Sequence, residues 1–205
     1  MRLFRPGFLA GRIYPEAFFR IKTTDKILYL TFDDGPDPLS TPRVVDILGS
    51  HNIKALFFCN GMKAEKFSDL MSHIRNEGHL IGNHGYSHLD GWRTDCETYI
   101  DDINRASVFT SDKILRPPYG HLSSGQYRIL KKKIRIVFWD LMPYDFDATF
   151  GSEKSLEILK KRFRPGSIIV LHDELSSCAN EILEEFIIFA KREGYRFELL
   201  DVAGD

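Results

Sequence analysis

Short apolar runs alternate along the chain with longer segments whose apolar residues recur at the spacing of an amphipathic helix. The short runs predict strands at Ile27–Phe32, Ala55–Phe58, His79–Ile81, Lys113–Leu115, Ile134–Trp139, Ser167–Leu171 and Arg196–Leu200. The longer segments predict helices at Pro42–Ser50, Ala64–Glu77, Asp95–Phe109, Ser123–Lys132, Ser152–Arg162 and Asn180–Glu193. Gly78 and Gly194 follow two of these helices, as expected at helix ends.

Alternation of strands and helices within one chain predicts an α/β fold with a parallel sheet. Seven strand candidates are one short of the eight in a regular (β/α) barrel. The pattern alone is therefore compatible with an irregular barrel and with an open, doubly wound sheet.

Composition narrows the class of protein. The chain has 205 residues, 43% of them hydrophobic and 28% charged, which is typical of one soluble globular domain. Its 28 basic and 29 acidic residues nearly cancel, so we expect no nucleic acid partner. Cys59, Cys96 and Cys178 are widely spaced and odd in number, and we interpret them as incidental thiols.

The N-terminal segment is basic and apolar, but Arg5, Pro6, Gly7 and Arg12 interrupt its apolar stretches. It therefore contains no signal-peptide core, and no run in the chain reaches the length of a membrane helix. We expect a cytoplasmic rather than an exported protein without a transmembrane segment. The apolar side chains of this segment favour packing under the sheet, with peripheral membrane contact as the alternative. They are Phe8, Leu9, Ile13, Phe18 and Phe19.

Polar residues capable of chemistry follow directly after five of the predicted strands. They are Asp33-Asp34, Asn83-His84, Arg116, Asp140 and His172-Asp173. The carboxyl ends of parallel strands meet at one edge of a sheet, where the sites of such folds assemble. We therefore expect these residues to form one site.

Two of these strand ends predict a metal site. Adjacent Asp33 and Asp34 point in different directions, so one can bind a metal while the other acts as a base. His84 and His88 are four residues apart, a spacing that suits a divalent ion. Two imidazoles and one carboxylate leave open positions, as in catalytic sites, and accept zinc, cobalt, nickel or iron. A solvated Asp-Gly turn and a surface histidine pair are the alternatives.

The remaining histidines lack such partners, and we interpret His51, His73, His79 and His121 as structural or surface residues. Arg116 precedes two prolines, which stiffen its loop, and can bind a carboxylate through two hydrogen bonds. His172 ends a buried strand and is a candidate general acid beside a metal, or else a structural histidine.

Together these strings resemble the NodB-type polysaccharide deacetylase family from about Ile27 to the C-terminus. The motifs that carry the resemblance are Thr31-Phe-Asp-Asp-Gly-Pro36, His84-Gly-Tyr-Ser-His88, Arg116-Pro-Pro-Tyr119, Asp145-Phe146 and Leu171-His172-Asp173. The chain departs from the usual pattern at Gly85, Met142, Phe146 and Ile169, which affects the expected substrate groove more than the metal or the chemistry.

The resemblance implies an irregular (β/α) barrel with about seven parallel strands. Residues 1–26 would be a segment packed on the barrel, and residues 27–205 the catalytic domain. The implied reaction is metal-dependent removal of acetyl groups, N-acetyl from amino sugars first, from a carbohydrate. Alternatives are a hydrolase of another acylated small molecule or lipid-linked sugar, and an inactive carbohydrate-binding relative. The oligomeric state stays open.

The resemblance also assigns roles to residues. Asp34, His84 and His88 would bind the metal, zinc in the first place. Asp33 would be the base that activates water, and His172 the acid that protonates the leaving amine. Arg116 would hold Asp33, and Asp145 would orient His172. The Tyr119 amide would stabilise the oxyanion, Leu171 would line the acetyl-methyl pocket, and Trp139 and Phe146 would line the groove.

Overall fold

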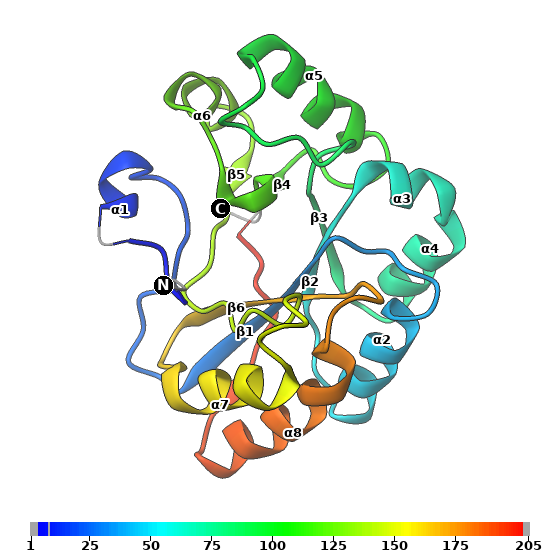
Figure 1. Cartoon of the computed structure of the whole chain (residues 1–205), viewed down its shortest axis with the longest axis vertical. Helices are drawn as coiled ribbons and strands as arrows, with labels where there is room; N and C mark the ends of the chain where they lie inside the picture. Colours follow the sequence, from blue (N-terminus) through cyan, green and yellow to red (C-terminus); the bar gives the residue numbers. More distant parts are fainter. Residues whose placement is uncertain (1–3, 8, 203–205) are drawn as a thin grey trace.

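The computed structural model describes residues 4–7 and 9–202. A curved parallel sheet of seven strands forms its centre, in the order β5-β4-β3-β2-β1-β6, and β7 pairs with the beginning of β1 (Figure 1). The strands are β1 (Ile27–Asp33), β2 (Leu56–Cys59), β3 (Leu80–Asn83), β4 (Ile114–Leu115), β5 (Arg135–Ile136), β6 (Ser167–His172) and β7 (Arg196–Phe197). The expected irregular barrel of about seven parallel strands is confirmed.

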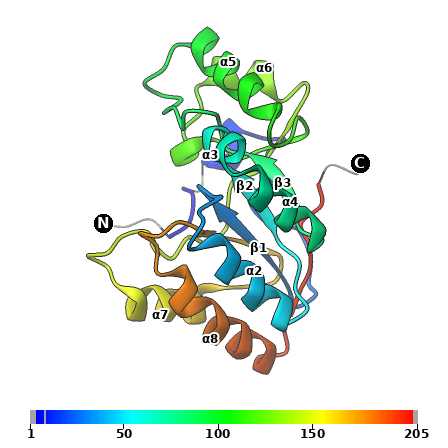
Figure 2. The same cartoon turned by 90° about the vertical axis from the view of Figure 1, so that its right-hand side faces the viewer.

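Helices cover the outside of this curved sheet. They are α1 (Ala10–Ile13), α2 (Thr41–Ser50), α3 (Gly61–Lys66), α4 (Ser68–Asn76), α5 (Cys96–Ser107), α6 (Ser124–Leu130), α7 (Ser152–Arg162) and α8 (Ala179–Arg192), with a 3-10 turn, η1 (Pro118–Gly120). Figure 2 shows α5 and α6 at one end of the molecule and α7 and α8 at the other. Among the described residues, no helix is long and apolar enough to cross a membrane.

Strand β1 shows how side-chain alternation divides the core. Leu28, Leu30 and Phe32 join the cluster that packs against α2 and α8. Ile27 and Tyr29 belong instead to a second cluster, with residues of β2, β4 and β6. Thr31 and Asp33 continue this second, inward face toward the carboxyl end of the strand. The interior is therefore apolar at one end and polar at the other.

The N-terminal segment lies beside the gap between β5 and β6. Phe18 forms a parallel bridge with Val137, and Arg20 forms an antiparallel bridge with Ser167. Beyond the end of β5, Leu141 pairs with Ile169 of β6. The ring is thus closed by isolated bridges rather than by an eighth strand, which makes the barrel irregular.

Apolar residues of this segment differ in their surroundings. Phe18 packs against the interior cluster, and the Phe19 ring stacks on Phe138 with ring centroids 4.8 Å apart. Leu9 and Ile13 are exposed. Phe8, the other residue considered for membrane contact, lies outside the described residues.

Three predicted elements differ from the structure by more than two residues at one end. The strand expected over Arg196–Leu200 ends at Phe197. The helix expected over Ala64–Glu77 is two helices, because the backbone leaves the helical region at Phe67, with φ −118° and ψ 52°. The strand expected over Ile134–Trp139 shrinks to Arg135–Ile136, because Val137 pairs with the distant Phe18.

Candidate active site

A cavity of about 330 Å³ opens at the carboxyl ends of the strands. It is lined by Asp33, Asp34, His84, His88, Pro117, Tyr119, Gly120, His121, Trp139, Met142, Phe146, Val170, His172 and Glu174. The carboxyl ends of five strands, β1, β3, β4, β5 and β6, contribute to it, as the positions of the polar residues predict.

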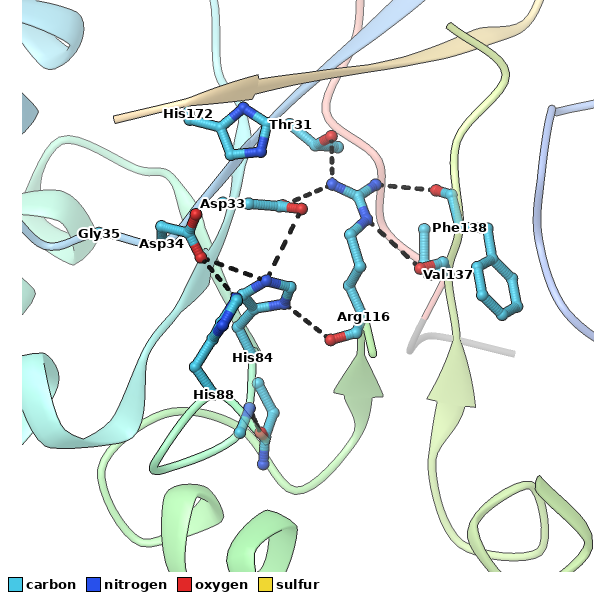
Figure 3. Close-up of polar contacts among 12 residues, drawn as sticks. Thr31, Asp33, Asp34, Gly35, His84, His88, Arg116, Val137, Phe138 and His172 are labelled. Atoms are coloured by element: carbon cyan, nitrogen blue, oxygen red, sulfur yellow. Dashed lines mark hydrogen bonds and ion pairs between the residues drawn. The ribbon is translucent and has the colours of Figure 1, made fainter. Parts of the chain in front are cut away.

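Asp34, His84 and His88 form one cluster in this cavity (Figure 3). Asp34 Oδ1 lies 3.0 Å from His88 Nε2 and 3.4 Å from His84 Nε2. One ligand atom from each residue lies within 4.8 Å of the others. Asp34 and His88 adopt left-handed backbone conformations, with φ 74° and 56°. Such conformations are costly for residues other than glycine, and here they aim both side chains at one point.

The donor set fits a divalent cation. His84 Nδ1 lies 2.8 Å from the Arg116 carbonyl oxygen, which can only accept, so Nδ1 carries the proton. Nε2 is then the unprotonated nitrogen and faces Asp34, as a metal ligand requires. Two nitrogens and one carboxylate oxygen suit zinc and related ions.

The loop between the two histidines is held from outside the cavity. The Asp102 carboxylate accepts hydrogen bonds from the backbone amides of Tyr86 at 2.7 Å and Ser87 at 2.9 Å. Gly85, where the resemblance leads us to expect Ser or Thr, has φ 72°, a conformation that favours glycine. Asp102 therefore fixes the spacing of His84 and His88.

Charge within the cluster shifts its pKa values. Burial favours a raised pKa for Asp34, but its interactions with the imidazoles of His84 and His88 outweigh burial and bring this pKa well below its usual value. Burial favours a lowered pKa for His84, but the charges of Asp33 and Asp34 outweigh it and raise this pKa. Both directions arise because the carboxylates and the imidazoles of this cluster stabilise each other.

Asp33 is held by a buried arginine (Figure 3). Its Oδ1 accepts a hydrogen bond of 2.6 Å from Arg116 Nη1, while Oδ2 lies 4.0 Å from His84 Nε2. Arg116 is fully buried and also donates to the Thr31 hydroxyl at 2.8 Å. It donates further to the carbonyl oxygens of Val137 at 3.3 Å and Phe138 at 2.8 Å. These partners fix the guanidinium, and through it one oxygen of Asp33.

His172 is held by a carboxylate. Its backbone amide donates to Asp145 Oδ2 at 2.7 Å, and its Nδ1 lies 3.1 Å from Asp145 Oδ1. The Ser177 hydroxyl also donates to Asp145 Oδ2. Burial favours a lowered pKa for His172, but the charge of Asp145 outweighs burial and raises this pKa to about 9. The imidazole is therefore protonated near neutral pH.

Aromatic side chains border the cavity. Tyr119 is exposed, has φ 60°, and lies edge-on to His88 with ring centroids 4.6 Å apart. Phe146 contacts His172 in the same manner at 4.8 Å. Trp139 lies against Gly120, where a Cβ atom would come 2.6 Å from the indole. Tyr119, Phe146 and Trp139 all line the cavity.

Leu171 is not among the residues that line the cavity. It is fully buried in the cluster beneath the outer helices, and Val170 lines the cavity instead. The reason is strand alternation, because Leu171 pairs in register with outward-facing Phe32 and Val170 pairs with inward-facing Thr31. Counting two residues back from His172 would have identified Val170.

Further differences concern three polar residues. His121, interpreted from the sequence as structural or superficial, lines the cavity. Glu174 lines it as well, and sequence reasoning did not single it out. Asp140 does not join the site, because its carboxylate binds Arg164 and Ser167 instead.

The sequence is similar to a known protein family and to several of its members. Residues 20–134 match the family model described as polysaccharide deacetylase. The chain is 35% identical over 182 residues to a peptidoglycan-N-acetylglucosamine deacetylase of Bacillus cereus, covering 83% of this chain and 66% of that relative. It is 30% identical to the peptidoglycan-N-acetylmuramic acid deacetylase of Bacillus subtilis, covering 91% and 74% of the two chains.

The fold is also similar to a solved structure. A crystal structure of a peptidoglycan N-acetylglucosamine deacetylase superimposes with a TM-score of 0.87 at 30% identity. The match covers 97% of this chain and 96% of that one.

Proposed function

Since the chain belongs to the polysaccharide deacetylase family, we propose that it is a metal-dependent hydrolase that removes acetyl groups from the amino sugars of a glycan. One observation carries the proposal. A metal-ligand cluster, a carboxylate fixed by arginine and a protonated histidine face a single cavity. Hydrolysis of an amide requires an electrophile at the carbonyl, a nucleophile and a proton for the leaving nitrogen.

Asp34, His84 and His88 would hold the divalent ion, with zinc as our first choice. When bound, such an ion polarises a carbonyl group and lowers the pKa of a water molecule. The ligand residues are already oriented for a cation, because the Arg116 carbonyl oxygen fixes the His84 tautomer. Asp102 fixes the loop that carries His88.

Asp33 acts as the base in this proposal. Arg116 occupies its Oδ1, so Oδ2, on the side of His84, accepts the proton of the attacking water. A carboxylate fixed in this way loses little orientational freedom during the reaction. Arg116 is thus a positioning residue that acts through Asp33.

His172 acts as the acid. Asp145 holds its Nδ1, so Nε2 is the nitrogen that donates a proton to the departing amine. The raised pKa of about 9 keeps this proton available at neutral pH. The Tyr119 backbone amide would donate to the oxygen of the acetyl carbonyl as it becomes negative. Val170, rather than Leu171, would contact the acetyl methyl group.

The names of the relatives suggest the substrate class. The relatives named as peptidoglycan deacetylases support N-acetylglucosamine or N-acetylmuramic acid as the sugar unit. A peptidoglycan substrate would require action outside the cytoplasmic membrane, whereas a free oligosaccharide would suit the cytoplasmic location expected from the sequence. We propose that residues 27–205 form the catalytic domain and that the described part of the segment before Ile27 packs on it.

Acetate release tests the proposal. The protein is loaded with zinc and incubated with N-acetylglucosamine oligomers, peptidoglycan fragments and acetylated xylan. We expect release from the amino-sugar substrates, its loss on chelation and its recovery on addition of zinc or cobalt. Full activity in protein shown to be metal-free would refute the mechanism. Release from other acyl compounds alone would indicate a different hydrolase, and tight sugar binding without release would indicate an inactive relative.

A further inference from the structure

An exposed tryptophan stands beside the wall of the catalytic cavity. Trp92 is 64% exposed, yet its indole stacks on His121 with ring centroids 3.6 Å apart and planes 10° apart. His121 itself lines the cavity. The exposed face of this large ring is accessible to a ligand, and an indole offers an extended apolar surface for stacking.

The loop that carries Trp92 is held rigidly. Asp90 Oδ1 accepts hydrogen bonds from the Trp92 backbone amide and from His121 Nδ1, both at 2.9 Å. The Gln126 side chain donates to the Gly91 carbonyl oxygen at 2.9 Å. A Cβ atom on Gly91 would overlap the His121 carbonyl oxygen, so only glycine allows this close approach. Indole and imidazole are therefore fixed relative to each other before any ligand arrives.

A tilted and an edge-on ring contact connect this stack to the metal-ligand cluster. The Tyr119 ring lies 5.9 Å from His121 and 4.6 Å from His88, measured between ring centroids. In this series of contacts, the rings of His121 and Tyr119 lie between Trp92 and His88.

From this arrangement we propose that Trp92, supported by His121, is a binding subsite for a pyranose ring of the glycan, beyond the sugar unit that is deacetylated. The apolar C–H face of a pyranose packs against an aromatic face, and a preordered ring binds it with little loss of conformational entropy. The proposal rests on the proposed function, since it assumes a glycan in the cavity. It adds that the enzyme acts on chains of several units.

Kinetics with oligomers of different length test the subsite. We compare kcat/KM for the dimer and the pentamer of N-acetylglucosamine in the zinc-loaded protein and in Trp92→Ala and Trp92→Phe. The pentamer-to-dimer ratio should fall about tenfold in Trp92→Ala, mostly through KM, and partly recover in Trp92→Phe. Val108→Ala, on another exposed apolar residue, should keep the ratio. An unchanged ratio in a folded Trp92→Ala protein overturns the proposal.

Binding measured without turnover separates this subsite from the catalytic assignment. Calorimetric titration of Asp33→Asn with the pentamer, with and without Trp92→Ala, should show about tenfold weaker binding when the indole is removed. Equal binding in the two proteins overturns the subsite even if acetate is released. Weaker binding with no acetate release by the unmodified protein would support the subsite and refute the proposed activity.

Discussion

The ends of β1 and β6 lie side by side in the sheet, and both bring a titratable residue to the same cavity. Asp33 and His172 are partners in the parallel register, so their side chains leave neighbouring strands on the same face. They differ in the residue that holds them. Arg116, which follows β4, holds Asp33, and Asp145, which follows β5, holds His172. Strand register therefore decides where the two groups lie.

The partners decide what the two groups can do. Arg116 occupies one oxygen of Asp33 and leaves the other for a proton from water. The anionic Asp145 keeps a proton on His172. A proton acceptor and a proton donor thus arise from equivalent positions of adjacent strands, because the elements that follow other strands supply opposite charges.

The largest effect is expected from substitution at the end of β1. Asp33→Asn cannot accept a proton at neutral pH, so kcat should fall by roughly 10²-fold or more while the zinc content stays near that of the unmodified protein. Asp34→Asn should instead weaken zinc binding and recover part of its activity at high zinc concentration. Metal analysis and zinc titration of both variants check this. Loss of zinc in Asp33→Asn with retention in Asp34→Asn would reverse the assignment.

Substitution of the partner of Asp33 should have the next largest effect. Arg116→Lys keeps the charge, but one ammonium cannot serve Thr31, Asp33 and two carbonyl oxygens together. We expect kcat to fall by about 10- to 100-fold, because Asp33 loses its fixed orientation. Arg164→Lys, at the Asp140 pair outside the cavity, is the matched control and should keep kcat. Equal kcat values in both variants would mean that Arg116 is only structural.

Asp145, the partner of His172, should determine the pH above which activity is lost. His172 carries its proton below its pKa of about 9 and loses it as the pH rises through that value. Asp145→Asn removes the charge that raises this pKa, so the alkaline limb of kcat/KM should move down by about one pH unit. Ser177→Ala removes one hydrogen bond to Asp145 and leaves the charge, so its limb should stay in place. A limb that stays in place in Asp145→Asn would argue against His172 as the acid.

We expect the smallest effects on catalysis from substitutions on the two faces of β6, Leu171 on the outer face and Val170 on the inner face. Leu171→Ala should lower the free energy of unfolding by about 2–5 kcal/mol, because Leu171 is fully buried beneath the helices, and leave kcat of the folded protein nearly unchanged. Val170→Ala should instead raise KM a few-fold. Denaturant titration and kinetics of both variants decide the matter. A larger KM change in Leu171→Ala would show that it contacts substrate after all.

The sheet could be predicted from the sequence because its strands are local apolar runs. Strand β4 begins at Ile114, one residue after its predicted start. Strand β6 ends at His172, one residue after its predicted end. The shortening of β5 could not be predicted, because it depends on pairing with Phe18, more than a hundred residues away. The break at Phe67 is equally hidden, since the apolar spacing continues through it.

The metal ligands and both proton-transfer candidates could be predicted because each follows a strand end or belongs to a recognisable string. The proposed sugar subsite at Trp92 and His121 could not be predicted. His121 and Trp92 are isolated in sequence, and only the Asp90 contacts bring them together beside the cavity. Asp140 shows the opposite case, because it follows a strand yet turns to Arg164.

The buried guanidinium of Arg116 links distant parts of the sheet. Its partners come from β1 and from the residues that follow β5, so it spans the interior between strands that are not neighbours. A partly folded chain that lacked either side would leave a buried charge unsatisfied, at a cost of about 3–5 kcal/mol. Intermediates with half of the sheet formed are therefore disfavoured. Unfolding should be cooperative across the barrel, and amide protons of β1 and β4 should exchange together.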